Sequence, residues 1–228
     1  MTKRGPSATH FASAAAMEFG EHEHYYIKLL RSLPLSCNAV HPPLKTIGIT
    51  SCYTGEGVST VAVRLAAVAA GTGMRVLLVD LNWQRPAIHR SFNVPASPGL
   101  SEALATYPGD DVPVQATHIA NLSVLTSGRA NAHDNLFTSA GNLNDLIRTL
   151  YVDFDLILFD LPACESAESN LTFVNVLDGV VLVVEAERVR WEVARRMKAL
   201  LTRSGANLLG AVLNKRRQPI PGWLYRKL

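Results

Sequence analysis

The stretch "TIGITSCYTGEGVST" (residues 46–60) indicates the architecture of this chain. It starts with a short β-rich run at 46–51, passes through a loop with two glycines and enters an alanine-rich segment that predicts a helix from Ser59 to Gly71. The apolar run "RVLLVD" (75–80) follows, which is typical of a strand buried on both faces. A strand, a helix and a second buried strand in this order predict one parallel unit of an α/β fold.

The same alternation continues along the chain. Further strands are predicted at 121–126, 155–160, 180–186 and 207–214, and helices at 22–33, 142–151, 170–179 (closed by Gly179) and 189–205. Six apolar strands separated by helices predict an α/β fold with a doubly wound, mostly parallel sheet and helices on both faces.

Length and composition fit one soluble domain. The chain has 228 residues, with 22 Lys and Arg against 19 Asp and Glu, and its net charge of +3 is too small to make nucleic acid the expected partner. We interpret residues 1–20 as a flexible N-terminal arm, 21–215 as a single domain, and 216–228 as a basic and aromatic C-terminal tail.

Cysteine usage and the absence of targeting signals predict a cytoplasmic location. Cys37, Cys52 and Cys164 are scattered, without metal-binding spacing, and we expect them to be reduced thiols. No secretory signal or membrane-spanning stretch is recognisable in the sequence. The basic and aromatic tail allows peripheral contact with a membrane surface.

The glycine loop departs from the phosphate-loop pattern GxxxxGK[ST] at two places. Cys52 stands at the first glycine and Val58 at the lysine, whereas Gly57 and Ser59 match. Gly55 and Gly57 would let backbone amides turn toward an anion at the start of the following helix. The loop therefore predicts a phosphate-binding backbone without the usual cation.

Several motifs in order resemble the bacterial tyrosine autokinases of capsule and exopolysaccharide assembly, which are deviant P-loop ATPases related to MinD and ParA. The matching segments are "TGEGVST", "LLVDLNWQRPAIHRSF", "PGL", "DLILFDLPA" and "LDGVVLVVEAE…LLGAVLNK". The resemblance covers residues 25–215, and such an ordered series is more specific than any single motif.

The resemblance implies a nucleotide site and its residues. The nucleotide-binding positions would be Gly55, Glu56, Gly57, Val58, Ser59, Thr60 and Asn214, the last near the adenine. Asp80 and Asp160 match the family's catalytic aspartates, and together with Ser59 they would hold magnesium. ATP and Mg²⁺ are thus the implied cofactors.

The departures from the family fall on the chemistry. Val58 removes a cation that would contribute about 4 kcal/mol at 4 Å from a phosphate oxygen in an effective dielectric of about 20. Asn82 and Gln84 replace an aspartate and an arginine, and the tail offers Tyr225 where relatives have a tyrosine cluster. We therefore expect weak or absent binding of ATP and Mg²⁺.

Three functions follow from these patterns. The first is a degenerate kinase that regulates an inner-membrane polysaccharide co-polymerase or an active paralogue from the cytoplasmic side, with a homo-oligomer as an option. The second is a working kinase or ATPase whose cation comes from elsewhere, such as Lys45 or a neighbouring subunit. The third is a positioning ATPase of the ParA and MinD type, against which the "DLNWQRPAIH" text argues.

Overall fold

A central sheet organises the part of the chain that the computed structural model describes, residues 23–35, 43–108, 111–129, 140–164 and 170–216. The strands are β1 (Thr46–Ser51), β2 (Val76–Asp80), β3 (Gln115–Ala116), β4 (Leu122–Leu125), β5 (Leu156–Asp160), β6 (Gly179–Glu185) and β7 (Leu208–Asn214). Their order in space is β3-β4-β2-β5-β1-β6-β7, and all neighbours are parallel except the short pair β3–β4. The predicted parallel sheet is confirmed.

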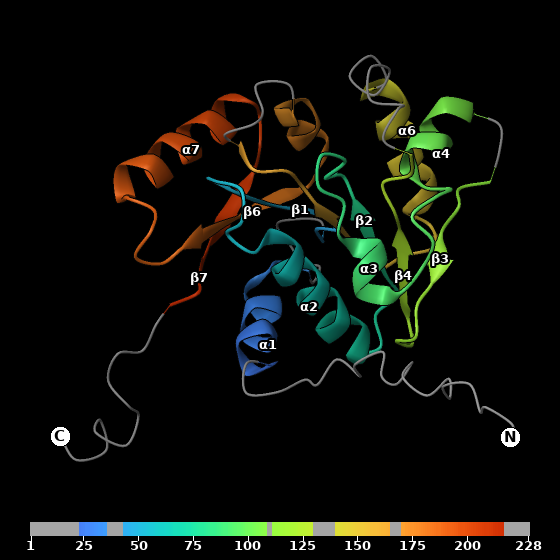
Figure 1. The fold of residues 1–228 in the computed structure, drawn as a ribbon, viewed down its shortest axis with the longest axis horizontal. Coiled ribbons are helices and arrows are strands. Elements are labelled where there is room, and N and C mark those ends of the chain that lie inside the picture. Colours follow the sequence, from blue (N-terminus) through green and yellow to red (C-terminus); the bar gives the residue numbers. More distant parts are fainter. Residues whose placement is uncertain (1–22, 36–42, 109–110, 130–139, 165–169, 217–228) are drawn as a thin grey trace, which may run out of the picture.

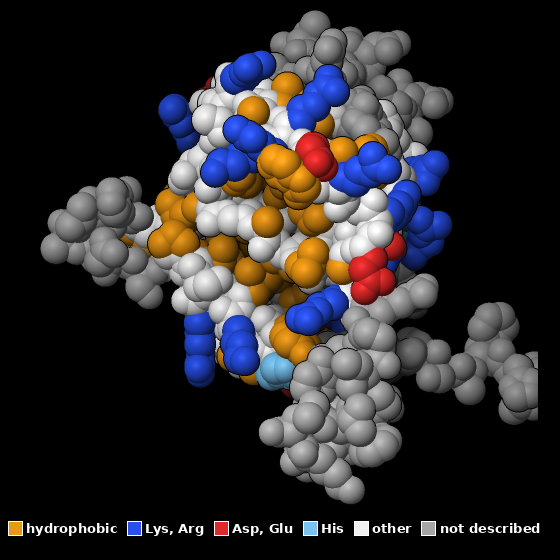
Figure 2. Space-filling model, turned by 90° about the vertical axis from the view of Figure 1, so that its left-hand side faces the viewer, with side chains coloured by type: hydrophobic (Ala, Val, Ile, Leu, Met, Phe, Trp, Pro, Cys, Tyr) orange, Lys and Arg blue, Asp and Glu red, His pale blue; other side chains and the backbone are white. Residues whose placement is uncertain are grey.

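Helices cover both faces of the sheet (Figure 1). They are α1 (Glu23–Ser32), α2 (Val58–Gly71), α3 (Ile88–Phe92), α4 (Leu100–Thr106), α6 (Ala140–Leu150), α7 (Trp191–Arg203) and the 3₁₀ helix η4 (Asn170–Val176). Helices α1, α2 and α3 pack on one face, and α4, α6 and α7 on the other. Strand β7 forms one edge, and Figure 2 shows the side of the molecule where it lies with α7.

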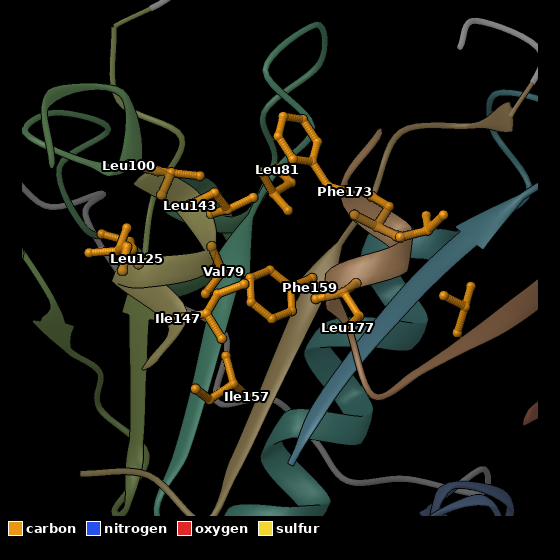
Figure 3. Packing of buried hydrophobic residues seen from close by; sticks show 14 of the residues in the cluster. Val79, Leu81, Leu100, Leu125, Leu143, Ile147, Ile157, Phe159, Phe173 and Leu177 are labelled. Atoms are coloured by element: carbon orange, nitrogen blue, oxygen red, sulfur yellow. The ribbon is translucent and has the colours of Figure 1, made fainter. Parts of the chain in front are cut away.

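The strands send alternate side chains into two separate cores, as expected for a sheet covered on both sides. On β5, Ile157 and Phe159 join the core beneath α6, whereas Leu156 and Leu158 join the core beneath α2. Figure 3 shows Phe159 at the centre of the first core, between Val79 and Leu177. Because both faces are buried, these strands are continuous apolar runs in the sequence.

Two features differ from the expectations, and some predictions fall on residues that the structure does not describe. Gly179 does not end a helix but opens β6, where it pairs with Ile47, and the helix before it is a 3₁₀ segment that ends at Val176. Helices α3 and α4 were not predicted, because five and seven residues are too few to show a helical period. The N-terminal arm, Cys37 and residues 217–228 lie outside the described ranges.

The topology places the glycine loop at the carboxyl end of a central strand of the sheet. Strand β1 lies between β5 and β6, so the chain that leaves β1 after Ser51 emerges beside the carboxyl ends of both neighbours. In open α/β sheets, ligands bind in the crevice at such a point.

Candidate functional site

A pocket of about 240 Å³ opens at the carboxyl edge of the sheet. Its walls come from the glycine loop, the start of α2, and the segments that follow β2 and β5. The lining residues are Ser51, Thr54, Gly55, Gly57, Val58, Ser59, Thr60, Asn82, Gln84, Arg85, Leu161, Pro162 and Ala163. Arg85, which is exposed, is the one charged residue among them.

The loop presents free backbone donors to this pocket. Gly55 and Gly57 have φ of 89° and 96°, a left-handed conformation that favours glycine, and a Cβ on Gly57 would also collide with Asn214 Nδ2. The ladder of α2 begins with the amide of Val61 donating to the carbonyl of Gly57. The amides of the first turn therefore have no acceptor within the helix and suit an anion.

Glu56 serves the loop itself rather than the pocket. Its side chain is fully buried, and Oε2 accepts the amides of Cys52 (2.8 Å) and Tyr53 (3.1 Å). Oε1 accepts the amide of Glu185 at 3.3 Å, at the end of β6. Two amides at the start of the loop are thus directed at an internal carboxylate and do not face a ligand.

The end of β7 holds the loop through residues that do not line the pocket. Asn214 Nδ2 donates to the carbonyl of Glu56 at 2.8 Å, and Lys215 Nζ donates to the carbonyl of Gly55 at 2.6 Å and to Glu185 Oε2 at 3.2 Å. Asn214 is not among the lining residues, so the adenine contact implied for it stays a prediction. The sequence signal for these contacts was only a polar pair at the end of a strand.

Val58 belongs to the core as well as to the pocket wall. Its exposed fraction is 9%, and it packs with the apolar residues beneath α2. Lys45, suggested as a substitute cation, is wrong for that role because it precedes β1, at the opposite edge of the sheet from the loop. Its Nζ donates to the carbonyl of Tyr151 at 2.8 Å.

Asp160 is a fully buried carboxylate at the end of β5, and neither of its oxygens has a hydrogen-bond partner. Burial, followed by the charge of Asp80, raises the pKa of Asp160 to about 8. The Ser59 hydroxyl lies near enough to lower this pKa without forming a hydrogen bond of good geometry. A buried acid in this state is ready to receive a cation or to hold a proton.

Asp80, at the end of β2, is also fully buried, but its carboxylate is occupied. Oδ1 accepts the amide of Asn82 at 3.0 Å, and Oδ2 accepts those of Ala87 (3.1 Å) and Ile88 (3.2 Å) at the start of α3. Burial raises the pKa of Asp80, and these hydrogen bonds oppose that rise. Asp80 therefore shapes the segment that carries Arg85, and its role toward magnesium stays a prediction.

The residues present fit a cation that also has ligands from elsewhere. Within the described part of the chain, no group of three His, Cys, Asp or Glu side chains could hold a metal ion. Mg²⁺ commonly uses one or two carboxylates together with substrate phosphates and water. The unpartnered Asp160 carboxylate and the nearby Ser59 hydroxyl match that pattern.

Sequence reasoning did not predict that Arg85 supplies the positive charge among the residues that line the pocket. Arg85 was noted only as part of a motif, and its place beside the loop depends on the turn that Asn82 closes by accepting the amide of Arg85.

Among the described residues, no helix is long and apolar enough to cross a bilayer.

Comparison with known proteins gives consistent relatives. The family model of ParA, described as NUBPL iron-transfer P-loop NTPase, matches residues 44–221. The tyrosine-protein kinase YwqD of Bacillus subtilis is 32% identical over 179 residues, covering 78% of this chain and 76% of that protein. The succinoglycan biosynthesis transport protein ExoP of Rhizobium meliloti is 26% identical over 195 residues, which are 83% of this chain and 25% of ExoP.

Solved structures agree in fold. The chimerical protein CapA2B2 superposes with a TM-score of 0.71 at 32% identity, covering 79% of this chain and 80% of that one. The septum site-determining protein MinD of Pyrococcus horikoshii, solved with Mg-ADP, has a TM-score of 0.62 at 21% identity, covering 80% and 76%. The second likeness concerns the fold alone.

Proposed function

Because the chain belongs to the bacterial tyrosine autokinases of the ParA-type P-loop NTPases, we propose that it is a degenerate kinase of capsule or exopolysaccharide assembly. In this proposal it acts by binding, as a regulatory partner of a membrane polysaccharide co-polymerase or of an active paralogue. Its site of action would be the inner face of the inner membrane.

One observation carries the proposal: the pocket keeps the phosphate-binding backbone but lacks the lysine. Val58 stands at that position with its side chain in the core, and Arg85 on the exposed rim is the one charged lining residue. Glu56 further engages two loop amides. Anion affinity then depends on the first turn of α2 and on Arg85, which argues for weak nucleotide binding.

If Mg²⁺ binds, Asp160 and Ser59 would hold it, and it would neutralise the charge of the carboxylate and bind phosphate oxygens. Asp160 would position this charge, and Asp80 would keep the Arg85 segment in place through its hydrogen bonds to Ala87 and Ile88. ATP and Mg²⁺ therefore remain ligands to be tested.

The test is calorimetric titration of ATP with Mg²⁺, together with assays of hydrolysis and phosphotyrosine formation. We expect weak or no binding and turnover at the background rate. Addition of the protein should also change the phosphotyrosine yield of an active autokinase of the same family. Micromolar affinity with turnover that is lost in Asp160→Asn would overturn the degenerate-kinase proposal.

A working ATPase is the second candidate, and the position of Arg85 at the pocket favours it. Here the guanidinium would replace the lysine as the cation for phosphate. Arg85→Ala should then abolish ATP binding, whereas Arg90→Ala on α3 should not. Equal affinity in the two variants would exclude this candidate.

A further inference from the structure

Positive charge is concentrated at one end of the chain. Residues 188–228 contain 11 of the 22 Lys and Arg residues but one of the 19 Asp and Glu residues, Glu192. The remaining 187 residues contain the other 11 basic and 18 acidic residues. The small net charge of the whole protein therefore conceals a strongly basic segment, and such asymmetry is typical of binding to an anionic surface.

The basic side chains of α7 are exposed on the surface of the molecule. The apolar side of the helix, with Val193, Met197 and Leu200, packs against the core. The opposite side exposes Arg195, Arg196, Lys198 and Arg203. Figure 2 shows Lys and Arg side chains across this side of the molecule, with few acidic ones among them.

Apolar side chains are exposed between these charges. Trp191, at the start of α7, is 64% exposed, and Leu213, on the edge strand β7, is 60% exposed. The Arg195 guanidinium lies 5.8 Å from the centre of the Trp191 ring. Figure 2 shows apolar surface between the basic side chains. Tryptophan beside arginine suits the boundary between water and lipid.

The rest of the basic segment begins beside the start of α7. Glu185 Oε2 accepts both Arg188 NH1 at 2.9 Å and Lys215 Nζ at 3.2 Å, so the end of β7 lies next to the residues that precede α7. The sequence then continues with Arg216, Arg217, Trp223, Tyr225, Arg226 and Lys227. The sequence that follows β7 is therefore also rich in basic and aromatic residues.

From this arrangement we propose that the α7–β7 side of the protein is a peripheral docking surface for an anionic lipid bilayer. The Lys and Arg side chains meet the lipid phosphates, and Trp191 and Leu213 enter the headgroup region. Duplex DNA would use the same cations but would leave the exposed aliphatic side chain of Leu213 in water, which is why lipid is the better match. The surface is distinct from the pocket, and the proposal does not depend on the proposed function.

The experiment is flotation of the full chain with vesicles of phosphatidylcholine, alone or with phosphatidylglycerol, at low and high salt. We expect binding only to the phosphatidylglycerol vesicles, weakened by salt. Arg196→Glu/Lys198→Glu should reduce binding by about tenfold or more, since each basic residue near an anionic surface adds to the attraction. Trp191→Ser should reduce it further at high salt, where the apolar contact carries more of the binding.

The matched control is Arg90→Glu/Arg148→Glu, which makes the same change in net charge at exposed positions on α3 and α6. The control should bind vesicles like the unmodified protein. Equal loss in both double variants would overturn the proposal, because binding would then follow net charge alone. Equal binding to neutral vesicles, or tighter binding to duplex DNA at the same phosphate concentration, would also overturn it. If the first double variant fails to fold, Arg196→Gln/Lys198→Gln serves instead.

Discussion

At the scale of single residues, two positions decide the chemistry of the pocket. Val58 replaces the phosphate-loop lysine and packs into the core, with 9% of its surface exposed. Asp160 stays as a fully buried carboxylate with no hydrogen-bond partner. The pocket therefore lacks the positive charge of the lysine but keeps a buried carboxyl group that a cation or a proton can neutralise.

The replacement Val58→Lys should recover measurable affinity for ATP with Mg²⁺, by at least about tenfold. The new ammonium would extend toward the pocket that already includes this position, while its methylene stem covers part of the core. Calorimetric titration measures the gain. Val152→Lys, at a position 77% exposed, is the control and should leave affinity unchanged. A folded Val58→Lys protein without any gain would mean that the loop backbone no longer accommodates phosphate.

Asp160 should make the protein less stable as the pH rises. Its pKa is about 8 in the folded protein against 3.8 ordinarily, so the folded state binds the proton more tightly than the unfolded state does. The free energy of unfolding should then fall between about pH 4 and 8, by up to roughly 1.4 kcal/mol per pH unit from this group. Urea denaturation in EDTA across this range should show the slope, and Asp160→Asn should flatten it. An unchanged slope in the variant would show that another group is responsible.

At the scale of elements, hydrogen bonds from its own Glu56 and from the end of β7 hold the glycine loop in place. Glu56 ties the loop start to β6, and Asn214 and Lys215 tie its outer carbonyls to the end of β7. The loop conformation thus depends on the edge strand as well as on β1 and α2. A structural change at the edge strand β7 should therefore also change the conformation of the glycine loop in the pocket wall.

Substitution Glu56→Gln should therefore loosen the loop. A glutamine cannot accept all three amides, because its NH₂ group would face a donor, and each hydrogen bond to a charged acceptor contributes about 1.5–3 kcal/mol. We expect a loss of that size in the free energy of unfolding and faster hydrogen exchange at Cys52 and Tyr53, which donate to this carboxylate. Glu192→Gln, on the exposed side of α7, is the control and should change neither. Unchanged exchange rates at both amides would contradict this account of the loop.

At the scale of the whole molecule, the sheet separates two cores that must form together. Phe159 lies in the middle of one of them, with 1% of its surface exposed (Figure 3). The pocket depends on both cores, because α2 packs on one face and the segment after β5 contacts the other. Loss of packing in one core should therefore also disturb the residues that form the pocket.

Replacement Phe159→Ala should cost about 3–5 kcal/mol, as for other large-to-small changes of buried aromatics. Thermal unfolding followed by circular dichroism measures the effect as a lowered Tm. The control Tyr25→Ala, at a position 52% exposed, should change Tm little. A drop confined to one of two separate transitions would show that the two cores unfold independently.

By itself, the sequence determined the fold class, the succession of the six main strands along the chain and the place of the glycine loop. Each of these follows from local patterns: apolar runs of strand length, glycine and proline boundaries, and motif order. The tertiary structure confirmed them and added only elements too short to have a period, such as α3 and β3. The missing lysine at Val58 was equally readable, since it concerns one position in a motif.

The tertiary structure alone decided what the charged groups do. Asp80 and Asp160 look alike at the ends of apolar strands, yet one accepts three amides and the other has no partner. Lys45 was suggested as the substitute cation, but it precedes β1 at the opposite edge of the sheet, whereas Arg85, which sequence reasoning did not consider for this role, lines the pocket. Hydrogen bonds and electrostatic contacts depend on distances between residues far apart in the chain, and only the packed sheet sets those distances.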